Sequence, residues 1–289
     1  MNKQVLYLAA STFLGLLFSF LFSEPVLLQI IIIFGQAHFI VAYFYKNKSG
    51  KLDKKYINNF LYFLVLLFIP TYFIGLNIVY VNYFIVFTTL IFVLHYFYDE
   101  LKIFNFQDDN FKNIAALAVF LSFTTIFTMM VFELKSILYL TPVIFLIILL
   151  FGMLNFKLIK RDFDFSKLEN LSIYLFTALN IFVPLLLLFT DIGVLKITGF
   201  IIIFHYLRWY FFYFDRFNSL EDKKELNFYL DVVFWVHIFV IILFVIYSID
   251  AKRGFLFLLF GPIFFYTWTL LHIVLSIRKD DYPLIFGKN

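Results

Sequence analysis

Histidine is the residue type in this chain with the clearest capacity for chemistry. All five histidines lie inside long apolar segments, and they are His38, His95, His205, His237 and His272. An ionisable residue in such a segment is rare and costly, so each one marks a candidate functional site. Neutral imidazole is a good ligand for iron, zinc or copper. The alternative is that a given histidine is a hydrogen-bonded packing residue, which is the interpretation we prefer for His237.

Charged residues accompany two of the histidines. His95 and Asp99 are four residues apart, so they share one face of a helix. His205, Arg208 and Asp215 follow one another along a single helical stripe. A metal-bound histidine usually donates its second N–H to a carboxylate or carbonyl, a role that Asp99 would fill. The alternatives are that Asp99 marks an interfacial helix end, and that Arg208 reaches the membrane surface or pairs with Asp215.

The composition identifies the solvent of these segments as lipid. Hydrophobic residues make up 63% of the 289 residues and charged residues 15%, against about 25% charged residues in soluble domains. The mean hydropathy is +0.94. The chain has no cysteine, which excludes disulfides, thiolate metal ligands and cysteine nucleophiles. The net charge of +4 comes from basic loops and indicates no nucleic-acid partner.

The apolar segments predict an all-α fold, a polytopic transmembrane bundle of about ten helices. Charge-poor stretches of about 18 or more residues are typical of spanning helices. Residues 1–289 are expected to form a single integral membrane domain. The predicted helices are 5–22, 26–45, 57–75, 78–98, 114–132, 137–155, 171–189, 193–214, 228–248 and 254–277.

The distribution of Lys and Arg predicts the orientation. Of the 23 basic residues, 18 lie in the long loops and at the two ends, and 4 lie in the connections on the opposite side. Cytoplasmic loops carry the excess of basic residues, so we expect both termini to be cytoplasmic, in a prokaryotic cytoplasmic membrane. In this orientation His38, His95, His205 and His272 all lie in the inner halves of their helices. These four histidines therefore form a predicted metal site.

Three segments resemble a known family: Gly35-Gln36-Ala37-His38-Phe39, Leu94-His95-Tyr96-Phe97-Tyr98-Asp99 and Phe204-His205-Tyr206-Leu207-Arg208-Trp209. The intervals of 57 and 110 residues between their histidines are similar to those of the Brp/Blh family of retinal-forming β-carotene dioxygenases. The resemblance implies a helical membrane enzyme that holds non-haem Fe(II) through histidines on different helices. It also implies O2 as co-substrate, a carotenoid such as β-carotene as substrate and retinal as product.

The chain departs from this family in two respects. The family's histidines are followed by glycine, whereas Phe39, Tyr96 and Tyr206 follow them here. The family's third segment has a second histidine four residues after the first, where this chain has Trp209. A four-histidine site would therefore need another ligand, and His272 is the candidate by depth, with His237 second. Tyr98, Asp99, Arg208, Trp209 and Asp215 are expected to support the ligands or line the substrate site.

The leading functional hypothesis is a metal-dependent oxygenase with a lipid-soluble apolar substrate, in which His38, His95 and His205 are catalytic. Membrane lipid is the surrounding partner, and no protein partner is inferred. Three alternatives stay open: a haem-binding electron-transfer protein, a proton-coupled transporter and a diverged non-catalytic relative. The compact histidine boxes of membrane desaturases and the HExxH and GxSxG motifs are absent from the sequence.

Overall fold

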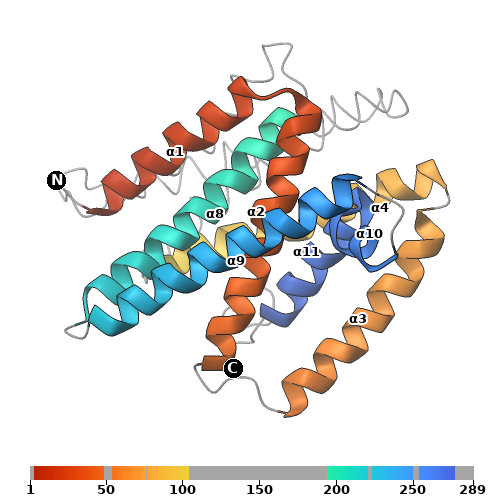
Figure 1. Ribbon diagram of the computed structural model, residues 1–289. Helices are drawn as coiled ribbons and strands as arrows, with labels where there is room; N and C mark the ends of the chain where they lie inside the picture. Colours follow the sequence, from red (N-terminus) through yellow and green to blue (C-terminus); the bar gives the residue numbers. More distant parts are fainter. Residues whose placement is uncertain are drawn as a thin grey trace, which may run out of the picture. The chain divides into compact units, whose positions relative to one another are not determined.

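The computed structural model describes residues 3–48, 54–75, 77–103, 194–220, 223–249 and 254–276. Within these ranges the chain forms eight helices and no strand (Figure 1), so the all-α prediction is confirmed for this part of the chain. The predicted helices 114–132, 137–155 and 171–189 lie outside the described residues. The total of ten helices and the single domain therefore stay predictions.

Four of the described helices are long and apolar enough to cross a membrane. They are Glu24–Tyr45, Ile57–Ile74, Leu195–Asn218 and Lys223–Ile249, and a bent fifth span is possible if α10 and α11 count as one. The helix bounds are α1 (Lys3–Leu21), α2 (Glu24–Lys48), α3 (Lys54–Ile74), α4 (Ile78–Ile103), α8 (Val194–Asn218), α9 (Lys223–Ile249), α10 (Gly254–Phe260) and α11 (Pro262–Ser276).

The chain divides into two compact units. The first unit comprises residues 1–27 and 93–209, and the second comprises residues 28–92 and 210–289. The described part of the first unit contains α1, the end of α4 and most of α8. The second unit contains most of α2, with α3, α9, α10 and α11.

A stripe of small residues lets α1 pack closely in the first unit. Ser11, Gly15 and Ser19 are four residues apart, so they lie on one helix face, and all three are buried. Small side chains allow the backbones of membrane helices to approach each other. A Cβ atom at Gly15 would lie 3.1 Å from Cδ2 of Phe200 and 3.4 Å from its carbonyl oxygen. Gly15 therefore sets the close contact between α1 and α8.

The predicted last helix, 254–277, is broken in two in the second unit. Helices α10 and α11 meet at an angle of 65°, because Pro262 has no N–H to donate to the carbonyl of Leu258. The Trp268 Nε1–H donates to that carbonyl oxygen at 2.9 Å. The Gln36 amide of α2 donates to the neighbouring carbonyl of Leu259 at 2.7 Å. Side chains thus satisfy the backbone at the break, as a membrane interior requires.

Helices α4 and α8, which carry candidate site residues, both extend beyond their predicted C-terminal ends. Helix α4 continues to Ile103 instead of ending at residue 98, and α8 continues to Asn218 instead of residue 214. Asp99 and Glu100 therefore lie within a helix. The buried side of α4 in the first unit includes His95, Tyr96 and Glu100.

Candidate metal centre

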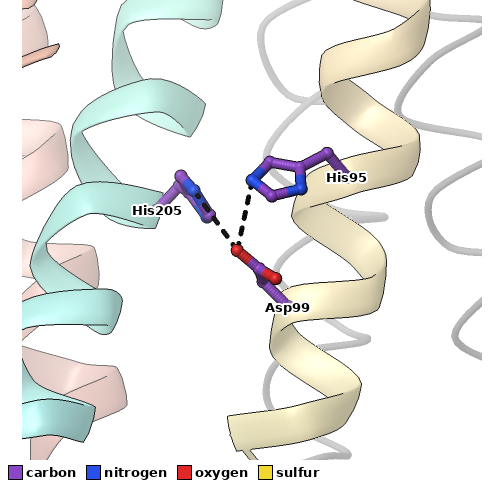
Figure 2. Close-up of side chains that lie close together, drawn as sticks. All are labelled: His95, Asp99 and His205. Atoms are coloured by element: carbon purple, nitrogen blue, oxygen red, sulfur yellow. Dashed lines mark ion pairs between the residues drawn. The ribbon is translucent and has the colours of Figure 1, made fainter. Parts of the chain in front are cut away.

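Three side chains from α4 and α8 converge in the first unit. His95 and Asp99 lie one turn apart on α4, and His205 lies on α8, with the Asp99 carboxylate directed between the two imidazole rings (Figure 2). Asp99 Oδ2 lies 3.2 Å from His95 Nε2 and 3.9 Å from His205 Nε2. The ring centroids of the two histidines are 5.5 Å apart. The predicted shared face of His95 and Asp99 is therefore confirmed.

The spacing of these groups fits a metal ion. Each of His95, Asp99 and His205 offers one ligand atom, and the three atoms lie within 4.8 Å of one another. Metal–ligand bonds of about 2.1 Å place neighbouring ligand atoms of an octahedral site roughly 3 Å apart. The three ligand atoms are therefore near one another but further apart than in a closed site, and they would have to approach one another to bind one ion. Both histidines are at most 3% exposed and Asp99 is 17% exposed, so the centre is largely shielded.

A buried ion pair lies beside the three ligand groups. Arg208 Nε donates to Glu100 Oε2 at 3.1 Å, and each of these side chains is 1% exposed. Glu100 follows Asp99 directly, and Arg208 is three residues after His205. Arg208 therefore has a buried carboxylate partner on α4 instead of lying at a surface. Glu100 is not among the predicted site residues, because its partner lies on another helix, 108 residues away in the sequence.

Aromatic rings surround His205. The ring of Tyr96 lies edge-on to it at a centroid distance of 5.7 Å, and the ring of Tyr206 lies at 5.9 Å. Phe204 contacts Tyr96 at 6.1 Å. All three aromatic side chains are buried. The surroundings of the candidate ligands are therefore largely apolar, with the charged groups concentrated in Asp99, Glu100 and Arg208.

Comparisons with known proteins identify no family or relative of this chain. No family model, curated protein or solved structure matches this chain. The resemblance to the Brp/Blh family therefore stays a prediction, based on the three histidine segments alone.

Two further predicted ligands, His38 and His272, lie together in the second unit. Their ring centroids are 5.1 Å apart, and both side chains are buried. The ring of Phe39 stacks on His272 at 4.8 Å. The structure thus brings the four predicted ligands together as two pairs, one in each unit. A single site containing all four stays a prediction.

His237 has contacts typical of a packing residue. Its Nδ1–H donates to the backbone oxygen of Val233 at 2.7 Å. Its Nε2 then accepts a hydrogen bond from the Tyr210 hydroxyl at 3.4 Å. Both ring nitrogens therefore have protein partners, which supports the structural interpretation of this histidine over its role as a second-choice ligand.

Three candidate residues remain, and the structure describes the side chains of two of them. Trp209 is half-buried and belongs to the first unit. Asp215 is half-buried and belongs to the second unit. The side chain of Tyr98 lies outside the described part of the chain, although its backbone is in α4. The expected roles of these three residues stay predictions.

Proposed function

We propose that this protein is a non-haem iron-dependent membrane oxygenase whose metal is held by His95, Asp99 and His205. The supporting observation is the donor set itself, two imidazoles and one carboxylate with ligand atoms within 4.8 Å of one another. Two histidines and one carboxylate on one side of the metal, with the other positions open, are typical of non-haem Fe(II) oxygenases. Asp99 is thus proposed as a ligand, and no longer only as a group that orients a histidine.

The proposed roles of the residues around the metal follow from the charges of the ligands and from the burial of the neighbouring aromatic side chains. The two neutral imidazoles and the single carboxylate would give a divalent ion three protein ligands and one compensating negative charge. Asp99 would supply the ligand that Trp209 cannot, relative to the family that the chain resembles. Bound Fe(II) would supply the capacity to activate O2. The buried aromatic residues Tyr96, Phe204 and Tyr206 would exclude water from the reacting groups.

The proposed substrate is apolar and dissolved in the lipid. An apolar molecule is recognised mainly by shape, in a site lined by hydrophobic and aromatic side chains with few polar groups. The aromatic residues around His205 fit this description. Within this class, the sequence resemblance favours a carotenoid such as β-carotene, cleaved with one O2 at its central double bond to give two molecules of retinal. His38 and His272 are proposed to contribute to the same activity.

The proposed membrane arrangement has ten spans. It combines the described apolar helices with those predicted between residues 104 and 193. The excess of Lys and Arg in the long loops favours cytoplasmic N- and C-termini in a prokaryotic cytoplasmic membrane. In this arrangement the C-terminal ends of α4 and α8 face the cytoplasm.

The proposed activity can be tested in a host that makes β-carotene. Expression of the wild-type chain should bleach the carotenoid and form retinal, whereas His205→Ala and Asp99→Asn should leave the colour unchanged. Asp231→Asn is a matched control, because Asp231 is an exposed carboxylate of α9. Persistent colour without retinal in the wild type would contradict carotenoid cleavage. Product formation by Asp99→Asn at the wild-type rate would contradict the proposed ligand.

One observation favours a transporter as the second candidate. Broken membrane helices such as α10 and α11 are common at transporter binding sites. Here, however, Gln36 and Trp268 already donate to the carbonyls of Leu259 and Leu258 at the break. A haem between His95 and His205 is less favourable, because the Asp99 carboxylate lies between the two rings (Figure 2). A Soret band in the absorption spectrum of the purified protein would support the haem alternative.

A further inference from the structure

Side-chain contacts join α4 to α8 at two levels in the first unit, a cluster around His205 and the ion pair of Glu100 with Arg208, and these two levels occur in the same order along both helices. His95 contacts His205, and further along both helices Glu100 contacts Arg208. Contacts that advance together along two helices require the helices to run in the same direction. At a rise of about 1.5 Å per residue, the two contacts are separated by about 7.5 Å along α4 and about 4.5 Å along α8. Together they fix both the sliding and the rotation of one helix against the other.

The ion pair restricts the relative position of the two helices more strongly than the contact between the histidine rings. Both charged groups are 1% exposed, and a buried charge is strongly unfavourable unless it is paired. If α4 were displaced by one residue along α8, the position opposite Arg208 would be taken by a neighbour of Glu100. Successive residues of a helix point about 100° apart, so Glu100 would lose its contact with Arg208. The same shift would move the adjacent Asp99 away from His205. The pair therefore penalises the displacements that would disperse the candidate ligands.

The pair also controls the charge beside the ligands. Arg208 compensates the charge of Glu100, so the pair adds no net charge beside the proposed ligands. Without Arg208, the Glu100 carboxylate would stand directly after Asp99 as a second buried anion. It would then compete for the ion or for a proton, and the set of ligands would change.

From these contacts we infer that Glu100 and Arg208 are a positioning pair, which sets the register of α4 on α8 and thereby assembles His95, Asp99 and His205 as one metal site. Neither residue is a ligand in this assignment. The part that concerns the metal rests on the proposed function, whereas the part that concerns the register does not.

The first arm of the test measures metal binding with Co2+, whose visible absorption reports its coordination. Glu100→Gln and Arg208→Gln should each weaken Co2+ binding by about 10–100-fold, the usual effect of removing a supporting group, and should alter the spectrum. The double variant removes both charges, so it should bind more tightly than either single variant, a non-additive result that indicates coupling. Arg208→Lys keeps the charge and should recover part of the affinity. Additive losses, or wild-type spectra in the single variants, would overturn the inference.

The second arm measures the register without metal. The chain has no cysteine, so Tyr96→Cys and Phe204→Cys introduce the only thiols, at rings whose centroids lie 6.1 Å apart. A short bis-reactive reagent should join them in the wild-type background and much less in Arg208→Gln. Equal cross-linking in both backgrounds would overturn the inference whatever the metal data show. If the wild type binds no Co2+ but cross-linking depends on Arg208, the proposed function fails and the register assignment stands.

Discussion

Asp99 Oδ2 lies 3.2 Å from Nε2 of His95 and 3.9 Å from Nε2 of His205, so one carboxylate bridges two helices (Figure 2). In an apolar interior such an arrangement needs a compensating positive charge. A proton on one imidazole would supply it, and so would a divalent ion held by all three groups. The buried Arg208 is already engaged by Glu100. A divalent ion between His95, Asp99 and His205 is the form of this compensation that the proposed function predicts.

Removal of one proposed imidazole ligand should weaken metal binding specifically. His205→Ala should lower the affinity for Co2+ by at least about 100-fold, since the loss of even a supporting group costs 10–100-fold. His237→Ala is the matched control, because both ring nitrogens of His237 have protein partners in the second unit. Titration of the purified variants with Co2+ measures both affinities. Equal losses in the two variants would indicate a general structural effect and contradict the assignment of His205.

A larger side chain at Gly15 should disrupt the packing of α1 on α8. A Cβ atom there already lies 3.1 Å from the Phe200 ring, so Gly15→Leu should reduce the free energy of unfolding by about 1–3 kcal/mol, the usual cost of overpacking. Ala9→Leu places the same side chain on an exposed position of α1, where an effect of about 0.5 kcal/mol or less is expected. Thermal unfolding in detergent compares the two. A greater loss for Ala9→Leu would contradict the packing described here.

The amide of Gln36 should stabilise the break between α10 and α11. Gln36→Leu removes the donor to the part-buried Leu259 carbonyl and should cost about 1 kcal/mol, the usual contribution of one such hydrogen bond. Gln29→Leu is the control on the same helix, because Gln29 is exposed. The midpoint of thermal unfolding should fall in the first variant and stay near the wild-type value in the second. Unchanged stability of Gln36→Leu would show that the carbonyl does not depend on this donor.

The proposed orientation predicts which helix ends can be labelled from outside the cell. Asn77 and Ser219 are exposed at the start of α4 and the end of α8, and the chain has no native cysteine. A membrane-impermeant maleimide should label Asn77→Cys in intact cells and Ser219→Cys only after permeabilisation. The opposite pattern would reverse the orientation. Labelling of both sites in intact cells would contradict the predicted number of spans.

The spacing of residues along one helix was sufficient to predict part of the candidate metal centre. The four-residue interval placed His95 and Asp99 on one face, and the common depth of the histidines favoured a contact between His95 and His205. The partner of Arg208 could not be obtained in this way. Asp215 lies seven residues, or about 10 Å, further along the same helix, whereas the partner Glu100 belongs to another helix and is 108 residues away in the sequence.

The fold was predictable at the level of helices but less so at their ends. Apolar length predicted α2, α3 and α9, whereas the polar residues from Asp99 onward suggested a loop that is in fact the last turn of α4. Pro262 interrupts the backbone hydrogen bonds at the break, but the angle of 65° also depends on Gly261. A Cβ atom at Gly261 would lie 2.7 Å from the Phe257 carbonyl oxygen. Sequence periodicity does not report such a backbone contact.

Metal analysis of the protein purified in detergent tests the central claim most directly. The wild type, reconstituted with Fe(II) without oxygen and freed of excess metal, should retain one equivalent of iron per chain. Asp99→Asn and His95→Ala should retain little, whereas Asp231→Asn should match the wild type. Full occupancy in both Asp99→Asn and His95→Ala would contradict the proposed metal centre, and so would a wild-type protein that retains no iron.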